Sequence, residues 1–392
     1  MERWEAIIVG AGPAGAATAL RLAARAPALA AGTLLLDKAR HPRDKVCAGG
    51  VIPKARALMA ELDVPFDVPQ VRVDTAGIAV PAASLTVRGD DLCRVVRRRE
   101  LDARLAWTAR ARGVALREDA RAVAIVRDGA GVRVETASGS HWAPVVVGAD
   151  GSGSLVRRAL VADDPGVVGR GVMCDVPAPQ ATWGGHPGGR YDFDFRPVLR
   201  GVRGYAWAFP CLIDGAPHVN VGVYALPPVS GVQLQRELER ALADVGAAPR
   251  RWQAFPIRTW ERAAPVAAPG VLLAGDAAGC DPLMGEGISF ALEYGLAAAD
   301  AVVAARAQGV DAGALYQRAV QDGRLGRKLG RLAWASRRFY GRQARTWFRL
   351  ARLSRRAQRV GLAWYNGADG MDTCGRWGLL RALVRPRVWP HA

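Results

Sequence analysis

Glycine-rich turns that contain an acidic residue, or that are followed by one at the end of the next apolar run, are the part of this sequence best suited to chemistry. The first, Gly10-x-Gly12-x-x-Gly15, lies between an apolar run and an alanine-rich segment, and Asp37 ends the next apolar run. Gly10 permits a tight bend, Gly12 lets the backbone approach a pyrophosphate, and Gly15 allows close helix–strand packing. The helix N-terminus offers free N–H groups to the anion. We therefore predict a dinucleotide site in which Asp37 binds ribose hydroxyls.

Two further turns of this kind indicate which dinucleotide is bound. Gly-Ala-Asp-Gly at 148–151 follows one apolar run and Gly275-Asp276 follows another; the second motif continues to a Gly-Glu-Gly turn at 285–287 that opens a helix. Asp150 and Asp276 can bind the ribityl hydroxyls of a flavin. The 285–287 turn places N–H groups and a helix dipole where a reduced flavin carries negative charge. The order and spacing of the turns predict FAD rather than NAD.

The elements that position these turns can be read from the hydrophobic pattern. Residues 5–9 and 33–36 are short buried strands joined by a helix that runs to about Arg25, which is a βαβ unit. Strands at 122–127 and 132–136 meet at a hairpin signal, Asp128-Gly129. Residues 145–147 and 271–274 are further buried strands, and the second leads into a helix through Arg306. These segments predict a Rossmann-type domain.

The domain organisation follows from a change in composition. Residues 167–262 are rich in β-branched and aromatic residues with frequent Gly and Pro, which is typical of an antiparallel sheet, with one helix at about 232–245. We therefore predict an α/β fold (α+β overall) with a discontinuous FAD-binding domain, residues 1–166 and 263–317. An antiparallel-sheet substrate domain, 167–262, is inserted in it, and 318–392 form a basic helical region.

Composition sets the broad class of the protein. Of 392 residues, 50% are hydrophobic and 23% are charged, enough for a large core. The six cysteines are scattered without a C-x-x-C pair, so we expect neither a disulfide framework nor a zinc site, and no metal. We find no apolar stretch of about 18 residues and no signal peptide, and expect a cytoplasmic protein.

Three local motifs resemble one family of flavoproteins. Across roughly residues 1–310 the chain resembles glutathione-reductase-type flavoproteins of the aromatic hydroxylase group, and more closely the geranylgeranyl reductase family. The motifs are P-R-D-K-V-C-A-G-G at 42–50, Arg98-x-x-Leu101-Asp102, and Tyr205-x-Trp207-x-Phe209-Pro210. Ala48 departs from the family's usual glycine. The resemblance places Arg98 near the flavin and the Tyr205 motif in the substrate pocket.

The resemblance implies reduction of isolated C=C bonds in a prenyl chain, by hydride from reduced flavin N5 and delivery of a proton. Such a site should be apolar, with aromatic walls that tolerate positive charge. Tyr205, Trp207 and Phe209 alternate, so on a strand they share one face. They form a substrate-binding surface unless they are ordinary core. Cys47 is the catalytic candidate, because a thiol is mostly protonated at neutral pH and can serve as a proton donor or redox partner beside the flavin. The alternative is that Cys47 is a small residue that fills a tight loop.

The expected cofactor contacts come from both the turns and the resemblance. They are Gly10, Gly12, Pro13, Ala14, Gly15, Asp37, Lys38, Cys47, Ala48, Gly49, Arg98, Asp150, Gly275, Asp276, Gly285, Glu286, Gly287 and Ile288. Arg43 and Lys45 bind cofactor phosphates, set the loop, or are simply exposed to solvent. Because no second GxGxxG exists, either NADPH binds transiently or a ferredoxin-type carrier supplies electrons. The sequence specifies no oligomeric state.

The C-terminal region carries most of the net charge of +18. Residues 318–392 contain eighteen Lys/Arg and three acids, with several tryptophans that include Trp389. On a helix an apolar stripe lies between the arginines: Leu332, Phe339, Ala344, Trp347, Leu350 and Leu353. Such helices lie on anionic membranes, so we expect peripheral attachment to the inner face of the cell membrane. The alternative is that the stripe docks on the protein itself. We expect no nucleic-acid partner, because no reader motif accompanies the charge.

Two other functions fit parts of the pattern. A flavin-dependent monooxygenase or halogenase acting on a hydrophobic or aromatic substrate would share the flavin scaffold, although the Cys47 loop argues against it. A protein that binds prenyl lipids without catalysis would also share the fold. The three turns argue against that, because such a protein needs no flavin.

Overall fold

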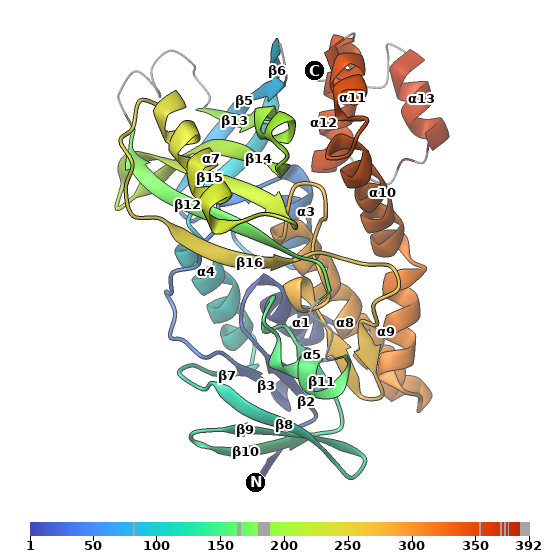
Figure 1. Ribbon diagram of the computed structural model, residues 1–392. Helices are drawn as coiled ribbons and strands as arrows, with labels where there is room; N and C mark the ends of the chain where they lie inside the picture. The colour runs from blue at the N-terminus through green and yellow to red at the C-terminus, as the bar shows by residue number, and fades with distance from the viewer. Residues whose placement is uncertain are drawn as a thin grey trace.

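The computed structural model describes residues 1–80, 83–162, 166–178, 189–352, 354–368, 371, 374 and 376–384. The cofactor half of the chain lies at the bottom of Figure 1, a large sheet lies above it, and helices from the C-terminal region stand beside both. Of the predicted apolar stripe and tryptophans, the side chain of Leu350 and the residues Leu353 and Trp389 fall outside this description.

A parallel sheet forms the cofactor half. In the part of the chain that the structure describes, its strand order is β17-β18-β11-β2-β3-β7, and only β17 is antiparallel to its neighbour. The strands are β2 (Ala6–Val9), β3 (Thr33–Leu36), β7 (Ala115–Arg117), β11 (Val146–Gly148), β17 (Ala267–Ala268) and β18 (Val271–Leu273). Every residue of β2 and β3 is buried, as expected of strands covered on both faces. The predicted βαβ unit is present.

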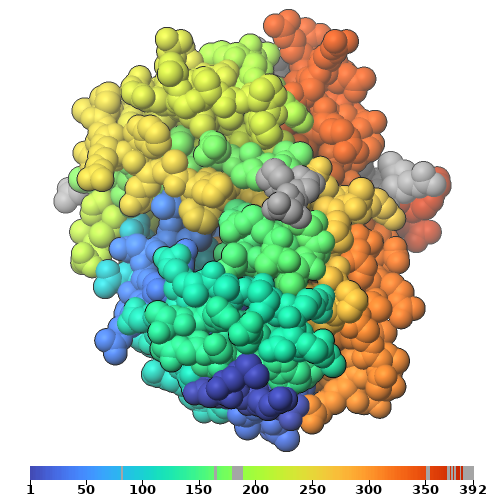
Figure 2. Space-filling model, turned by 60° about the horizontal axis from the view of Figure 1, so that its bottom comes forward, coloured from blue at the N-terminus to red at the C-terminus, as the bar shows by residue number. Residues whose placement is uncertain are grey.

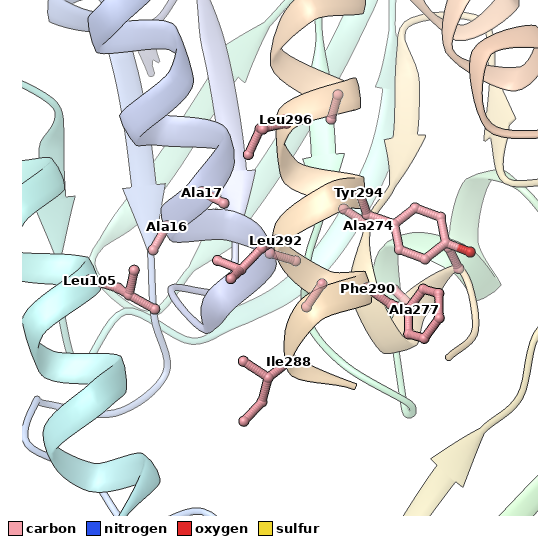
Figure 3. Close-up of a cluster of buried hydrophobic side chains, with 14 of the residues drawn as sticks. Ala16, Ala17, Leu105, Ala274, Ala277, Ile288, Phe290, Leu292, Tyr294 and Leu296 are labelled. Carbon is pink, nitrogen blue, oxygen red and sulfur yellow. The ribbon is translucent and has the colours of Figure 1, made fainter. Parts of the chain in front are cut away.

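Helices α1 (Pro13–Arg25), α4 (Arg98–Ala111) and α8 (Ile288–Gln308) carry the main core of this half. Figure 3 shows Leu292 and Leu296 of α8 on the side of α1 that carries Ala17, while Ala16 lies on the side of α1 toward Leu105 of α4. Helix α8 is long and apolar enough to cross a membrane, with a mean hydropathy of 1.5, but 72% of that window is buried in the protein. Its apolar composition is therefore accounted for by core packing.

The second sheet is larger than the sequence indicated. Its order among the described residues is β16-β12-β15-β14-β13-β5-β6-β4, antiparallel apart from the parallel pair β13 and β5. Three strands precede residue 167: β4 (Gly50–Val51), β5 (Gln70–Val80) and β6 (Ala83–Val96). The others are β12 (Val168–Pro177), β13 (Gly189–Asp194), β14 (Arg203–Ile213), β15 (Ala216–Leu226) and β16 (Gln253–Arg258). Residues 50–96 thus share the sheet predicted for 167–262.

A small sheet closes the lower face, which comes forward in Figure 2. It pairs β1 (Glu2–Arg3), β10 (Gly139–Ala143), β9 (Gly131–Thr136) and β8 (Ala122–Asp128), and β8 and β9 are the predicted hairpin. The remaining short and peripheral helices are α2 (Pro27–Ala31), α3 (Pro53–Glu61), α5 (Leu155–Leu160), α7 (Gly231–Asp244), α9 (Ala312–Gln321), η1 (Arg196–Arg200) and η2 (Gly275–Ala277).

The C-terminal helices pack on the protein. They are α10 (Arg324–Phe339), α11 (Ala344–Arg352), α12 (Arg355–Asn366) and α13 (Arg376–Val384), seen at the upper right of Figure 1. Leu332 and Ala344 of the predicted stripe are buried, and Phe348 of α11 lies 5.8 Å from the ring of Phe195. Leu332 and Ala344 therefore face inward, as in the docking alternative, whereas Phe339 and Trp347 of the stripe are half-buried. Trp334 and Trp377 remain 45% and 68% exposed.

Candidate active site

One cavity of about 1130 Å³ brings together segments from the whole chain. Of the residues predicted to bind cofactor or substrate, all except Gly15 line it. The cavity exceeds the usual size of a small-molecule pocket, so it has room for a dinucleotide and a second ligand.

The first glycine turn has the geometry that its spacing predicted. Gly10 has a φ of +104°, and a side chain there would strike the backbone of Ala149. A side chain on Gly15 would collide with the carbonyl oxygen of Gly10, which explains why Gly15 packs under the turn and not against the cavity. Helix α1 begins after Gly12 with no side-chain cap, so its N–H groups are available to an anion.

Asp37 ties this turn to the next strand. Its Oδ2 accepts a hydrogen bond from Ala11 N at 2.9 Å and its Oδ1 one from Ala39 N at 2.9 Å. Arg43 Nε lies 3.5 Å from Oδ1. A carboxylate offers about four acceptor positions, so Asp37 can both shape the turn and accept ribose hydroxyls.

The other two acids stand where the FAD prediction needs acceptors. Asp150 Oδ2 accepts from Leu155 N and Val156 N at 2.6 and 3.2 Å, which caps α5. Its Oδ1 is buried and has no hydrogen-bond partner among the described residues, and burial raises the pKa of this carboxyl. Ser152 Oγ donates to Asp276 Oδ2 at 3.3 Å. Asp150 and Asp276 both line this dinucleotide-sized cavity, and carboxylates accept hydrogen bonds from hydroxyls, so these residues fit the ribityl group of FAD.

The Gly-Glu-Gly turn forms the third part of the cofactor site. Gly285 has a φ of +68°, and Gly287 precedes the first residue of α8. The Glu286 carboxylate accepts from Ser289 N at 2.8 Å and from the Ser289 hydroxyl. Burial within the cavity, helped by the charge of Asp281, raises the pKa of Glu286 to about 7. The N-terminus of α8 thus borders the cavity beside a carboxyl that changes charge near neutral pH.

Cys47 lies in a loop held by an ion-pair network that the sequence did not reveal. Arg98 makes a bidentate pair with Asp102, at 2.7 and 2.9 Å, and lies within electrostatic reach of Cys47, whose sulfur accepts a hydrogen bond from Gly49 N at 3.4 Å. Arg43 reaches the same fully buried Asp102 at 3.2 Å, so it sets the loop. Burial opposes the charge of Arg98, but Asp102 outweighs it and raises the pKa of Arg98. The motif contained Asp102, and its position four residues after Arg98 on a helix was the missed signal.

Lys45 is a second ionisable group of this loop. Its ammonium lies 2.8 Å from the ring centroid of Phe255, a cation–π contact. Burial, followed by repulsion from Arg98, lowers the pKa of Lys45 to about 8. Lys45 lines the cavity inside the protein, so the solvent-exposed reading of this residue is wrong.

The three predicted aromatic residues of β14 form a wall of the cavity, as their alternation indicated. The ring centroids of Tyr205 and Trp207 lie 6.1 Å apart, and Phe209 lies 5.2 Å from Phe193. Sequence reasoning missed the matching wall from β13 and the turn after it, Tyr191, Phe193 and Phe195, although they alternate in the same way. Both sets are therefore parts of one aromatic slot.

Trp207 is fixed by its neighbour strand. Its Nε1 donates to Asn220 Oδ1 at 2.7 Å, and Asn220 Nδ2 donates to Asp175 Oδ1 at 2.7 Å. Gly222 pairs with Trp207 across the strands, and a side chain on Gly222 would overlap the indole ring. The orientation of Trp207 therefore depends on the absence of a side chain at 222.

The far end of the cavity is built by the C-terminal region. Its lining residues there are Ala335, Phe339, Gly361, Leu362, Trp364, Tyr365 and Asn366. They come from α10 and α12, more than a hundred residues after β14. No local signal in the sequence connects them with the cofactor turns.

No protein-family profile matches the chain. It is 29% identical over 330 residues to the menaquinone reductase of Mycolicibacterium smegmatis, covering 76% of each protein. Among solved structures it is similar to a geranylgeranyl bacteriochlorophyll reductase-like protein from Thermoplasma acidophilum (TM-score 0.72, 21% identity, 98% of this chain and 96% of that one). It also resembles a flavin-dependent brominase (TM-score 0.69, 16% identity, 93% and 94%).

Proposed function

We propose that this chain, which has the geranylgeranyl reductase-like flavoprotein fold, reduces isolated C=C bonds in the prenyl chain of a hydrophobic isoprenoid. The observation that carries the proposal is a single cavity that joins a dinucleotide turn to an aromatic slot, with Cys47 on its wall. The similarity to a menaquinone reductase supports an isoprenoid substrate.

The residues of the chain divide the work of such a reaction. Reduced FAD, when bound, supplies a hydride. Tyr205, Trp207 and Phe209 bind the prenyl chain, exclude water and tolerate positive charge that develops on an alkene carbon. Aromatic side chains line the slot, so we expect the proton to come from a residue on the cavity wall.

Cys47 is the residue that holds this proton at its sulfur. Gly49 N donates a hydrogen bond to the Cys47 sulfur, and Arg98, held by Asp102, lies within electrostatic reach of it. Lys45, whose pKa is lowered to about 8, lies within electrostatic reach of Cys47 and can return a proton to it after each turnover. Electrons reach the site from NADPH or from a ferredoxin-type carrier.

The protein works at a membrane surface on this account, where prenyl lipids reside. The exposed Arg337 and Trp334 lie on α10, which also lines the cavity, and the exposed Arg345 and Arg349 lie on the next helix, α11. Flotation of the full chain with anionic and neutral vesicles tests this. Arg337→Glu, Arg345→Glu and Arg349→Glu together should abolish binding to anionic vesicles; unchanged binding would contradict it. Truncation is unsuitable because it would open the cavity.

Anaerobic mass spectrometry tests the reaction itself. The FAD-loaded, chemically reduced protein is mixed with prenyl diphosphates, prenylated quinones and prenylated pigments. A gain of two hydrogen atoms for each reduced bond is expected for at least one of these classes. Absence of any mass gain with bound FAD would exclude the reductase function.

A second function, oxygen-dependent hydroxylation or halogenation of a hydrophobic or aromatic substrate, is favoured by the structural similarity to a flavin-dependent brominase. The same panel run in air, with halide, separates the two. Products that gain oxygen or halogen only in air would favour this second function.

A further inference from the structure

Three tyrosine hydroxyls hold the loop that connects η2 to α8, residues 281–287. Tyr205 donates to Met284 O at 2.6 Å, Tyr340 to Leu283 O at 2.6 Å, and Tyr365 to Asp281 Oδ2 at 2.9 Å. Tyr205 belongs to the large sheet, whereas Tyr340 and Tyr365 belong to the C-terminal region. The loop that forms the third cofactor turn is therefore held from outside the cofactor-binding half.

Asp281 gives this loop its shape. It is fully buried, and its carboxylate accepts from Leu283 N at 2.7 Å and from Met284 N at 3.0 Å. Burial raises the pKa of Asp281, which means that its charged form depends on these donors. Gly285 N donates to Asp281 O at 3.1 Å, which carries the turn on to Gly287 and the start of α8. The third donor to the Asp281 carboxylate is Tyr365.

Tyr365 is itself held firmly, because its two neighbours are bonded to different parts of the protein. Lys328 of α10, only 3% exposed, donates from Nζ to Trp364 O at 2.7 Å and lies 3.8 Å over the Trp364 ring. Asn366 Nδ2 donates to Leu92 O of β6 at 3.1 Å. The end of α12 is thus fixed to α10, to the large sheet and to the cofactor loop at successive residues.

We propose that Tyr365 is a positioning residue for flavin binding: through Asp281 it fixes the 281–287 loop, so the C-terminal region is a structural part of the cofactor site. This inference rests on the proposed binding of FAD. Removing one donor from a buried carboxylate loosens what the remaining donors hold. The N–H groups at 285–287 then meet the flavin from a less ordered loop, whereas the turn at Gly10 is unaffected.

Titrations of the purified, FAD-free full chain test the proposal. Tyr365→Phe should weaken FAD binding about tenfold, as expected for the loss of roughly one hydrogen bond. ADP probes only the end of the cavity formed by Gly10 and Asp37, so its dissociation constant should stay unchanged. Tyr340→Phe should give the same pattern by loosening Leu283.

The matched control is Tyr316→Phe. Tyr316 is fully buried and donates to Leu273 O at 2.6 Å, but it does not line the cavity. The Tyr316→Phe variant should be less stable than the wild type, without a selective loss of FAD affinity. Unchanged FAD binding in Tyr365→Phe, or equal weakening of ADP and FAD, would overturn the proposal. Failure of the wild-type chain to bind FAD would instead overturn the proposed function.

Discussion

The two ends of the cavity are built in different ways. At the cofactor end, backbone conformation makes the site, with Gly10 at a φ of +104° and Gly15 packed beneath it. At the slot end, side chains from β13, β14 and the C-terminal helices make the wall. A site made by backbone demands glycine at fixed spacing, while a site made by packing accepts many residue types. The difference predicts where substitutions are severe and where they are graded.

The largest effect is expected at the cofactor end. Gly15→Val places a side chain against Gly10 O. The overpacked turn should weaken the binding free energy of FAD by about 3 kcal/mol, which is roughly a hundredfold in FAD affinity. Isothermal titration with FAD measures it. Gly231→Val is the control, because a side chain there meets no atom within 4 Å. Comparable FAD binding in the two variants would mean that the turn tolerates side chains.

A substitution of Cys47, which lines the cavity, should distinguish FAD binding from catalysis. Cys47→Ala should retain FAD and lose about a hundredfold in turnover, the usual contribution of a general acid. The rate at which the reduced, FAD-loaded variant reduces the prenyl substrate without oxygen measures this loss. Cys174→Ala, which removes a buried thiol away from the cavity, should stay within twofold of wild type. A Cys47→Ala variant with normal turnover would leave Cys47 as loop filler.

In the aromatic slot, Gly222→Ala should act through Trp207. The added methyl group overlaps the indole ring of Trp207, so the ring must shift within the slot. We expect this overpacking to reduce the binding free energy of the substrate by about 1–3 kcal/mol. The Michaelis constant for the prenyl substrate should therefore rise at least several-fold, while the dissociation constant of FAD stays constant. Equal changes in both constants would show that the slot and the cofactor end are not independent.

Gly361 tests the mouth of the slot. It lies on α12, it is exposed, and a side chain there would meet no atom within 4 Å. Gly361→Phe should raise the Michaelis constant of long prenyl substrates about tenfold, a packing effect of roughly 1–2 kcal/mol, and leave short ones unchanged. Gly361→Ala is the control. Similar effects on long and short chains would place the entrance elsewhere.

The last expected effect is on stability rather than on binding or turnover, and it concerns Glu286, near the border between the two ends. Its folded pKa of about 7 lies above its value of 4.5 in the unfolded chain, so the folded protein binds more protons between these pH values. The free energy of unfolding of the wild type should thus fall with rising pH across this window, relative to Glu286→Gln, by up to about 3 kcal/mol. Denaturant unfolding at both ends of the window measures it. A constant difference would argue against the shifted pKa.

The same contrast explains how much of the molecule the sequence predicted. The glycine turns, the βαβ unit and the alternation of Tyr205, Trp207 and Phe209 are local patterns, and the structure places these residues around one cavity. The equivalent alternation at Tyr191 and Phe193 was readable but was missed, because no motif accompanied it.

The sequence could not show partners that meet only through tertiary packing. Tyr365 donates to Asp281 across 84 positions of sequence, and β5, which precedes the predicted insertion, is the parallel neighbour of β13 within it. Nor did the amphipathic stripe reveal which surface it faces. Leu332 packs in the main core, and Ala344 packs in a cluster with Val80 of the large sheet.

A single-turnover experiment tests the central claim most directly. The FAD-loaded protein is reduced without oxygen and mixed with the isoprenoid identified as substrate, beside a compound with the same head group and a saturated chain. We predict that oxidised-flavin absorbance returns with the unsaturated chain only, at one equivalent per reduced bond. A flavin that stays reduced with both compounds, or is reoxidised equally by both, would contradict the account.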